Sequence, residues 1–158
     1  MQTKIKILLL GLFLLIIPNK FVAQSNQQII PLSCTSVLAD INAYRLAHGL
    51  EKLQLDSEIS QVARNHSHRM ADHEIEFGHG GFSQRTQQLR TLFPHARGMA
   101  ENVAYADRDN TKPLVQSWLV SSGHRKNILG DYNLTGIGVA HDANGRVYVT
   151  QIFVRTGA

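Results

Sequence analysis

The sequence has 158 residues, with 16 Lys and Arg side chains against 12 Asp and Glu, a formal net charge of +4. The excess is concentrated at the amino terminus, where Lys4, Lys6 and Lys20 lie in a stretch without acidic residues. Beyond that stretch 13 basic side chains face 12 acidic ones, so the rest of the chain is nearly neutral, at +1. This balance excludes nucleic-acid binding through a strongly charged face.

The first 23 residues have the pattern of a signal peptide. Two lysines precede an apolar run from Ile7 to Ile17, and Ala23 offers a small residue for cleavage before Gln24. The run is shorter than the roughly 20 residues that cross a bilayer as a helix. We therefore expect residues 1–23 to be removed, which leaves no transmembrane span in a mature protein that is periplasmic or extracellular. An uncleaved amino-terminal anchor is the alternative.

The remaining part of about 135 residues is long enough for one domain with its own core. We interpret residues 24–34 as a polar linker and residues 35–158 as the domain. Cys34 is the only cysteine, so an exported chain has no intramolecular disulfide and is held together by packing. Because Cys34 lies well beyond the apolar run, we expect a packed thiol rather than a lipid anchor.

Apolar residues at helical spacing predict helices over residues 35–48, 57–73 and 83–93, and a fourth that begins at Pro113 and ends at Ser122–Gly123. The first helix ends at Gly49, a residue typical of helix ends. Asp56 can cap the second helix, since its side chain can accept hydrogen bonds from free amides of the first turn.

The carboxyl-terminal part changes to a period of two residues. Residues 136–141 and 146–154 read as strands joined across Asn144–Gly145, a strong hairpin signal. The second strand is apolar on both faces, which indicates a central position in the sheet. Gly136 and Gly138 leave one face of the first strand bare, so a helix can approach it closely. A short strand over residues 102–106 completes a sheet with helices on both sides.

Three residues stand out as candidates for chemistry. His79 lies in the Gly-rich loop Phe77–Phe82, Glu101 directly precedes an apolar strand, and His124 follows the end of a predicted helix. If the three converge, two imidazoles and a carboxylate define a metal site or an acid/base pair. The metal hypothesis assigns His79, His124 and Glu101 as ligands of Zn²⁺ or another divalent cation, and the catalytic hypothesis makes Glu101 a general base.

We expect the other histidines to have structural positions. His66 lies on the apolar stripe of its helix and reads as a hydrogen-bonded core residue, with support of the site residues as the alternative. His48 and His95 read as surface residues, and His141 as a structural residue of a strand. The segment His73–Phe77 lacks the second histidine of a zincin helix.

Several segments occur in the order and approximate spacing of the CAP superfamily, which comprises cysteine-rich secretory proteins, antigen 5 and plant pathogenesis-related proteins. The segments that carry this resemblance are Tyr44–Leu50, His66–Ala71, Phe77–His79, Ala100–Val103, Trp118–Leu129, Gly136–Val139 and Tyr148–Phe153. The stretch Ser121–Leu129 is similar to the bacterial branch, whose members are typically exported. The resemblance covers the chain from about Ser36. It implies an α+β fold, a three-layer α-β-α sandwich with a central antiparallel sheet.

The resemblance also implies a cleft. His79 matches the first histidine of the family's cleft and Glu101 the carboxylate of its Gly-Glu-Asn motif. Ser121 and Tyr148 stand where eukaryotic relatives have a second glutamate and a second histidine, while His124 is the bacterial-type histidine. The expected cleft therefore contains these five residues, with a geometry that differs from the eukaryotic one.

Three functions follow as hypotheses. The first is a binding module whose cleft takes a divalent metal or an extracellular small-molecule, lipid or peptide ligand. The second is a metal-dependent extracellular hydrolase with Glu101 as general base; a serine hydrolase is disfavoured because no G-x-S-x-G elbow surrounds Ser121 or Ser122. The third is a structural or partner-interaction protein.

Overall fold

The computed structural model describes residues 33–107 and 111–157, so the expected signal peptide and most of the expected linker lie outside the described residues. The elements follow one another as α1 (Cys34–Ala47), β1 (Gln54–Leu55), α2 (Ser57–Ala71), α3 (Phe82–Leu92), β2 (Gly98–Ala106), α4 (Thr111–Val120), α5 (Ser122–Ile128), β3 (Leu134–His141) and β4 (Val147–Arg155). Among these described helices, none has the length and apolar character needed to cross a membrane.

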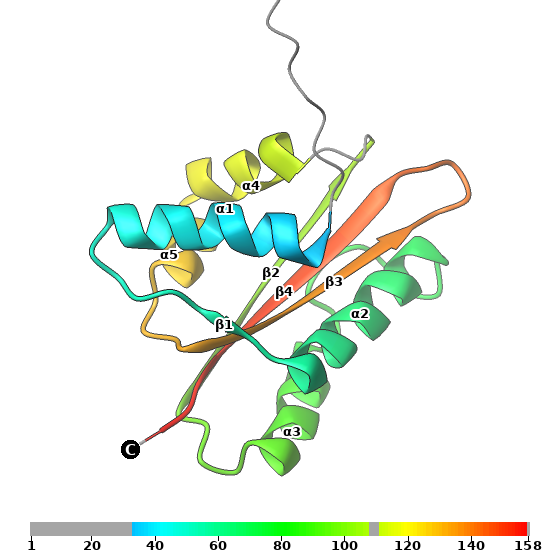
Figure 1. Cartoon of the computed structure of the whole chain (residues 1–158). Helices are drawn as coiled ribbons and strands as arrows, with labels where there is room; N and C mark the ends of the chain where they lie inside the picture. The colour runs from blue at the N-terminus through cyan, green and yellow to red at the C-terminus, as the bar shows by residue number, and fades with distance from the viewer. Residues whose placement is uncertain (1–32, 108–110, 158) are drawn as a thin grey trace, which may run out of the picture.

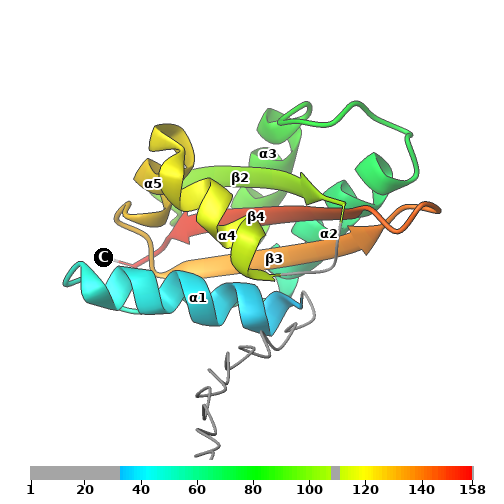
Figure 2. The same cartoon turned by 90° about the horizontal axis from the view of Figure 1, so that it is seen from above.

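The strands form one sheet in the order β1-β3-β4-β2. Helices α1, α4 and α5 cover one face, and α2 and α3 cover the other (Figures 1 and 2). This arrangement confirms the expected α+β sandwich with three layers. The sheet is mixed rather than wholly antiparallel, because the two-residue β1 pairs in parallel with β3 while the pairs β3–β4 and β2–β4 are antiparallel.

The sequence patterns located most elements but missed α5 and the two-residue strand β1. Ser122 and Gly123 were expected to end a helix; instead they begin a second one, with Ser121 as an extended N-cap residue at φ −77° and ψ 121°. Strand β2 is also longer than expected, since it begins at Gly98 rather than at residue 102. Both differences matter because α5 carries His124 and the early part of β2 carries Glu101.

Two glycines of β3 allow α2 to lie directly on the sheet, as the sequence predicted. A Cβ atom added at Gly136 would overlap the backbone of Ile59 and Ser60, and one added at Gly138 would overlap the backbone between Ala63 and Arg64. Helix α2 is held there by the Ser67 hydroxyl, which donates to the Gly138 carbonyl at 3.0 Å. The close approach fixes the helix that leads into the Gly-rich loop.

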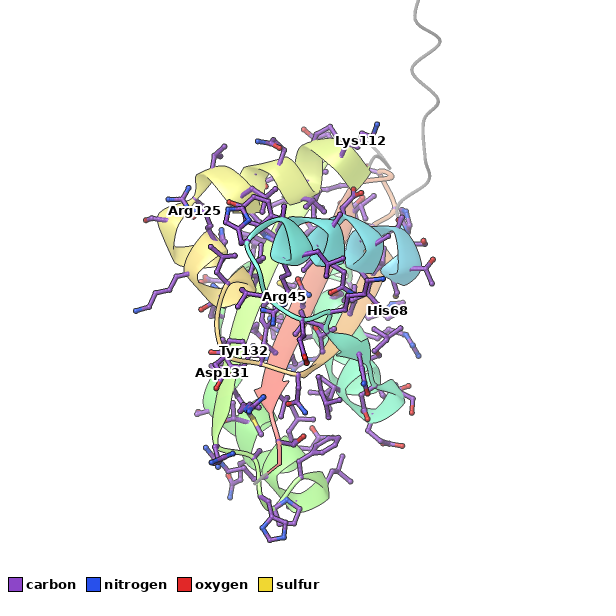
Figure 3. All side chains as sticks on the ribbon, turned by 60° about the vertical axis from the view of Figure 1, so that its left-hand side comes forward. Arg45, His68, Lys112, Arg125, Asp131 and Tyr132 are labelled. Atoms are coloured by element: carbon purple, nitrogen blue, oxygen red, sulfur yellow. The ribbon has the colours of Figure 1, made fainter. Side chains whose placement is uncertain are left out.

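A buried arginine fastens the opposite layer. Arg45 of α1 is 2% exposed, and its guanidinium donates hydrogen bonds to main-chain carbonyls of the two segments beside it (Figure 3). The acceptors are the carbonyls of Glu51, Ile128, Gly130 and Tyr132, at 2.7–3.1 Å. Arg45 thereby ties α1 to the end of α5 and fixes the position of that helix.

Cys34 begins α1 as a half-buried free cysteine. Its thiol donates to the carbonyl of Ile137 on β3 at 3.1 Å, and burial raises its pKa. The packed thiol that the sequence predicted is what the structure contains.

Gly138→Ala is expected to destabilise the fold by about 2–3 kcal/mol, because a methyl group there meets the rigid backbone of α2 rather than a movable side chain. The measurement is urea denaturation of the purified protein. Gly123→Ala is the control, since its Cβ would enter open space within a helix and should leave stability unchanged or slightly raised. Equal stability of the Gly138→Ala variant and the parent would contradict close packing of α2 on β3.

Candidate functional site

The site is built around the edge strand β2, whose successive side chains point into different layers. Glu101 faces the α2–α3 side, where it contacts His79 and Arg85. Asn102 faces α5, where its side-chain amide donates to the His124 carbonyl at 3.2 Å. Because β2 has β4 as its neighbour on one side and lies at the sheet edge on the other, residues from both helical layers can meet beside it.

The outer edge of β2 is covered by side chains of α4 and α5. The Trp118 indole donates to the Val103 carbonyl and the Asn127 amide donates to the Glu101 carbonyl, both at 3.2 Å. Asn127 also donates to the Asn102 side chain at 2.9 Å. These bonds occupy acceptors that an open edge would offer to another strand, and they hold α5 against β2.

Glu101 is clamped by three hydrogen bonds. Arg85 donates from Nε to Oε2 at 2.8 Å and from Nη2 to Oε1 at 2.7 Å, and His79 Nδ1 donates to Oε1 at 3.0 Å. The Glu101 side chain is 1% exposed and that of Arg85 is 11% exposed. A bidentate guanidinium–carboxylate pair at this depth is a strong, directional interaction. It compensates the buried charge and leaves Glu101 little capacity for another partner.

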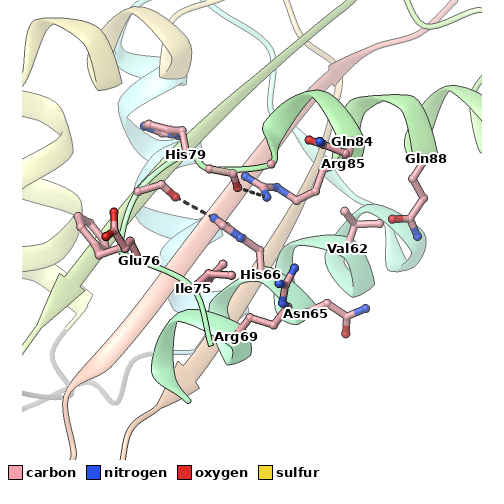
Figure 4. A pocket seen from close by; sticks show the side chains of 14 residues that line it. Val62, Asn65, His66, Arg69, Ile75, Glu76, His79, Gln84, Arg85 and Gln88 are labelled. Carbon is pink, nitrogen blue, oxygen red and sulfur yellow. Dashed lines mark hydrogen bonds between the residues drawn. The ribbon is translucent and has the colours of Figure 1, made fainter. Parts of the chain in front are cut away.

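The Gly-rich loop is fixed from two sides (Figure 4). His66 Nε2 donates to the Gly78 carbonyl at 2.9 Å, and Arg85 Nη1 donates to the Gly80 carbonyl at 2.8 Å. His66 is 2% exposed, so it is a hydrogen-bonded core residue that also supports the loop presenting His79. Its Nδ1 is buried and has no partner among the described residues.

His79 and His124 approach β2 from different layers. The His79 side chain is 51% exposed, whereas the Nδ1 of His124 is buried without a hydrogen-bond partner in the described part of the chain. Burial lowers the pKa of His124, and the nearby His79 lowers it further. The contribution of His79 to this shift indicates that the two imidazoles lie close enough to interact electrostatically.

A pocket of about 800 Å³ opens beside His79 between α2, α3 and the Gly-rich loop. Its walls combine amide, guanidinium and imidazole groups with an apolar surface of similar extent. The residues that line it are Val62, Asn65, His66, Arg69, Ile75, Glu76, Phe77, Gly78, His79, Gly80, Gly81, Gln84, Arg85 and Gln88. Such a surface suits a ligand that has both hydrogen-bonding groups and an apolar part.

The two other expected cleft residues, like His124, do not line this pocket. Tyr148 is 4% exposed and lines a separate, smaller pocket with Phe77. Ser121 is the half-buried N-cap residue of α5, without a capping hydrogen bond from its side chain. The structure therefore brings His79 and Glu101 into contact, places His124 nearby, and separates Tyr148 from the pocket that His79 lines.

A divalent metal fits this arrangement only in part. Within residues 33–107 and 111–157, no group of three or more His, Cys, Asp and Glu side chains is placed to hold a metal ion. Both Glu101 oxygens already accept hydrogen bonds, so Glu101 fits the position of a carboxylate that orients His79 rather than that of a ligand. The imidazoles of His79 and His124 are the groups that fit direct contact with a metal.

Sequence reasoning missed Arg85, Asn102 and Asn127. Asn102 and Asn127 lie inside segments that carry the family resemblance, so the motif itself signals them. Arg85 lies on a helix with little amphipathic pattern, and no local feature distinguishes it from Arg90. Its role appears only when α3 is placed beside β2.

Arg85→Met is expected to lower the free energy of unfolding by about 3–5 kcal/mol, because it leaves the buried Glu101 carboxylate without its cation. Urea denaturation measures the loss. Arg69→Met is the matched control: the Arg69–Glu74 pair has side chains 57% and 58% exposed, so its loss should cost less than about 1 kcal/mol. Similar losses in the two variants would contradict the clamp.

The lowered pKa of the buried His66 predicts that the folded protein loses stability in acid. Burial, followed by the nearby Arg85, lowers its pKa, so the unfolded chain takes up a proton at a higher pH than the folded protein does. The free energy of unfolding should therefore decline as the pH falls from about 6.5, the usual histidine value, to the lower pKa of the folded state. His66→Gln keeps a donor for Gly78 and should flatten this decline in denaturation curves recorded across that range. An unchanged slope in the variant would contradict the assignment.

Comparison with known proteins identifies relatives of the chain. The sequence model of the Cysteine-rich secretory protein family, CAP, matches residues 38–153. The Uncharacterized membrane protein YlbC of Bacillus subtilis (strain 168) is 36% identical over 120 residues, which cover 72% of this chain and 32% of that protein.

Two solved bacterial structures share the fold. An extracellular protein containing a SCP domain from Bacillus anthracis str. Ames matches with a TM-score of 0.63 and 29% identity over 78% of this chain and 40% of its own. The cysteine-rich secretory protein SAV1118 from Staphylococcus aureus subsp. aureus Mu50 matches with a TM-score of 0.64 and 25% identity, over 78% and 38%. This chain thus spans less than half the length of each of these relatives. With a family match over most of its length and this fold, the chain belongs to the Cysteine-rich secretory protein (CAP) family.

Proposed function

We propose that the chain is an exported binding module of the CAP family whose cleft at the β2 edge holds a polar ligand through His79 and His124. The clamp on Glu101 is the observation that carries this proposal. Export is supported by the signal-peptide pattern of residues 1–23 and by the similarity to an extracellular SCP-domain protein of Bacillus anthracis.

The clamp favours binding over catalysis by Glu101. A general base must present a free lone pair to the proton that it removes. Glu101 is 1% exposed, and its two oxygens accept three hydrogen bonds, two of them from a permanently charged guanidinium. A substrate proton therefore has little access to this carboxylate. Its remaining role is to fix the ring of the exposed His79.

His79 is the group best placed to contact a ligand. Since Nδ1 donates to Glu101, the proton of a neutral ring resides there and Nε2 carries a lone pair. His124 supplies a second imidazole whose lowered pKa favours the neutral form. Neutral imidazole nitrogens are good ligands of Zn²⁺, which would supply positive charge for polarising a bound polar group.

The proposal predicts that Zn²⁺ binds to the purified protein and that His79→Ala and His124→Ala each weaken binding at least about ten-fold, as expected when one direct ligand is lost. Isothermal titration calorimetry measures the change. His68→Ala removes an exposed imidazole of α2 that neither lines the pocket of His79 nor lies on α5, so it is the control and should bind as the parent does. Parent-like binding by both cleft variants would contradict the metal part of the proposal.

A further inference from the structure

A second, smaller pocket of about 360 Å³ adjoins the pocket that His79 lines. Neither His79 nor His124 lines this second pocket. The loop that leaves α2 separates the two pockets, because Ile75, Glu76 and Phe77 line both. The full lining is Met70, His73, Glu74, Ile75, Glu76, Phe77 and Tyr148. The pocket is thus partly aromatic and partly acidic.

Aromatic rings from three different segments meet at this pocket. The Phe77 ring packs edge-on against Tyr105 at 4.9 Å between centroids, and Tyr148 lies 6.5 Å from Phe77 and 6.1 Å from Tyr105. Phe77 is 46% exposed and Tyr105 is 49% exposed, whereas Tyr148 is buried. The half-exposed rings of Phe77 and Tyr105 thus pack against each other and against the buried ring of Tyr148, so their positions are fixed without a ligand.

The backbone of the pocket wall is fixed as well. His73, two residues after the end of α2, has a positive φ of 56°, which turns the chain back over the helix. The Glu74 amide then donates to the Arg69 carbonyl at 2.9 Å, and the next residues run along the pocket. Glu74 and Glu76 of this segment line the pocket together with Phe77.

The charges around the pocket leave one carboxylate without a cation. Glu74 pairs with Arg69 at 3.3 Å, and the neighbouring Arg146 pairs with Asp107 at 2.8 Å. Glu76 is exposed and makes no ion pair within the described residues. The pocket therefore combines ring faces with an uncompensated negative charge, which is the chemistry that attracts an organic cation.

One ring of this aromatic cluster, that of Tyr105, already carries a cation of the protein. The Arg146 guanidinium lies over the Tyr105 ring at 4.8 Å from its centroid. Arg146 does not itself line the pocket, although its side chain also interacts with that of Tyr148. Phe77 is therefore the exposed ring of the pocket that carries no cation from the described part of the chain.

We propose that this pocket binds the alkylammonium group of a small organic cation. Phe77 supplies the exposed ring, Tyr148 the buried aromatic floor, and Glu76 the compensating charge. Met70 adds a polarizable thioether at the base. The ligand class differs from that of the imidazole cleft, so the two sites can be tested separately.

Choline is the probe, and 3,3-dimethylbutan-1-ol is its matched control because it has the same shape without the charge. NMR titration of the purified protein should show saturable shifts of Met70 and Tyr148 signals with choline, and at least about three-fold weaker binding of the alcohol. Equal binding of the two compounds would overturn the proposal, as would the absence of saturable shifts with choline. Choline shifts centred on His79 and His124 would place the cation in the other cleft and would overturn it too.

Two substitutions test the residues named. Glu76→Gln and Phe77→Leu should each weaken choline binding about three-fold or more, because one removes the charge and the other the ring face. Glu51→Gln is the control, since Glu51 is an exposed carboxylate on the loop between α1 and β1. Parent-like choline affinity in both pocket variants would overturn the proposal.

Discussion

The arrangement of the site depends on the ion pair between Arg85 and Glu101. A carboxylate at 1% exposure is costly unless donors surround it, and the bidentate guanidinium supplies two of the three that Glu101 receives. The same guanidinium holds the Gly80 carbonyl, so one side chain joins α3, the edge strand and the Gly-rich loop. His79 is presented on that loop and completes the shell of the carboxylate. Without the pair, the loop would keep its bond from His66 to the Gly78 carbonyl, but the carboxylate that orients the ring of His79 would no longer be fixed.

The edge position of β2 explains how the imidazoles of His79 and His124, which come from different layers, lie near each other. Glu101 points to the α2–α3 layer and Asn102 to α5, and the amide of Asn127 connects the two by bonding to the Glu101 carbonyl and the Asn102 side chain. A central strand could not do this, because both of its edges are used by neighbouring strands. The arrangement orients groups and compensates charge, which is what a binding module requires. It also uses the oxygens of Glu101 as acceptors for Arg85 and His79, which leaves them less able to accept a proton from a substrate.

Local sequence features predicted much of the fold and part of the site. Gly136 and Gly138 predicted the close approach of α2, and the Gly-rich loop indicated His79, because each of these signals is contained in a few consecutive residues. Arg85 could not be found in this way, since its partner lies 16 residues away on another element and its own helix has little pattern. Helix α5 was missed because Ser122 and Gly123 are residues typical of a helix end. In the structure α4 ends at Val120, the extended Ser121 separates the two helices, and α5 begins at Ser122. Tyr148 stands at the sequence position where eukaryotic relatives have a cleft histidine. Its ring instead lies near those of Phe77 and Tyr105, beside the neighbouring pocket.

The clamped carboxylate of Glu101 fixes the proton of His79 on Nδ1. Nitrogen-15 NMR of the imidazole at neutral pH tests this directly, because the two ring nitrogens have distinct shifts in each tautomer. We expect a protonated Nδ1 with a one-bond N–H coupling, and we expect Arg85→Met to reduce the population of this form. A His79 ring with its proton on Nε2 and a bare Nδ1 facing Glu101 would show that Glu101 does not orient the ring.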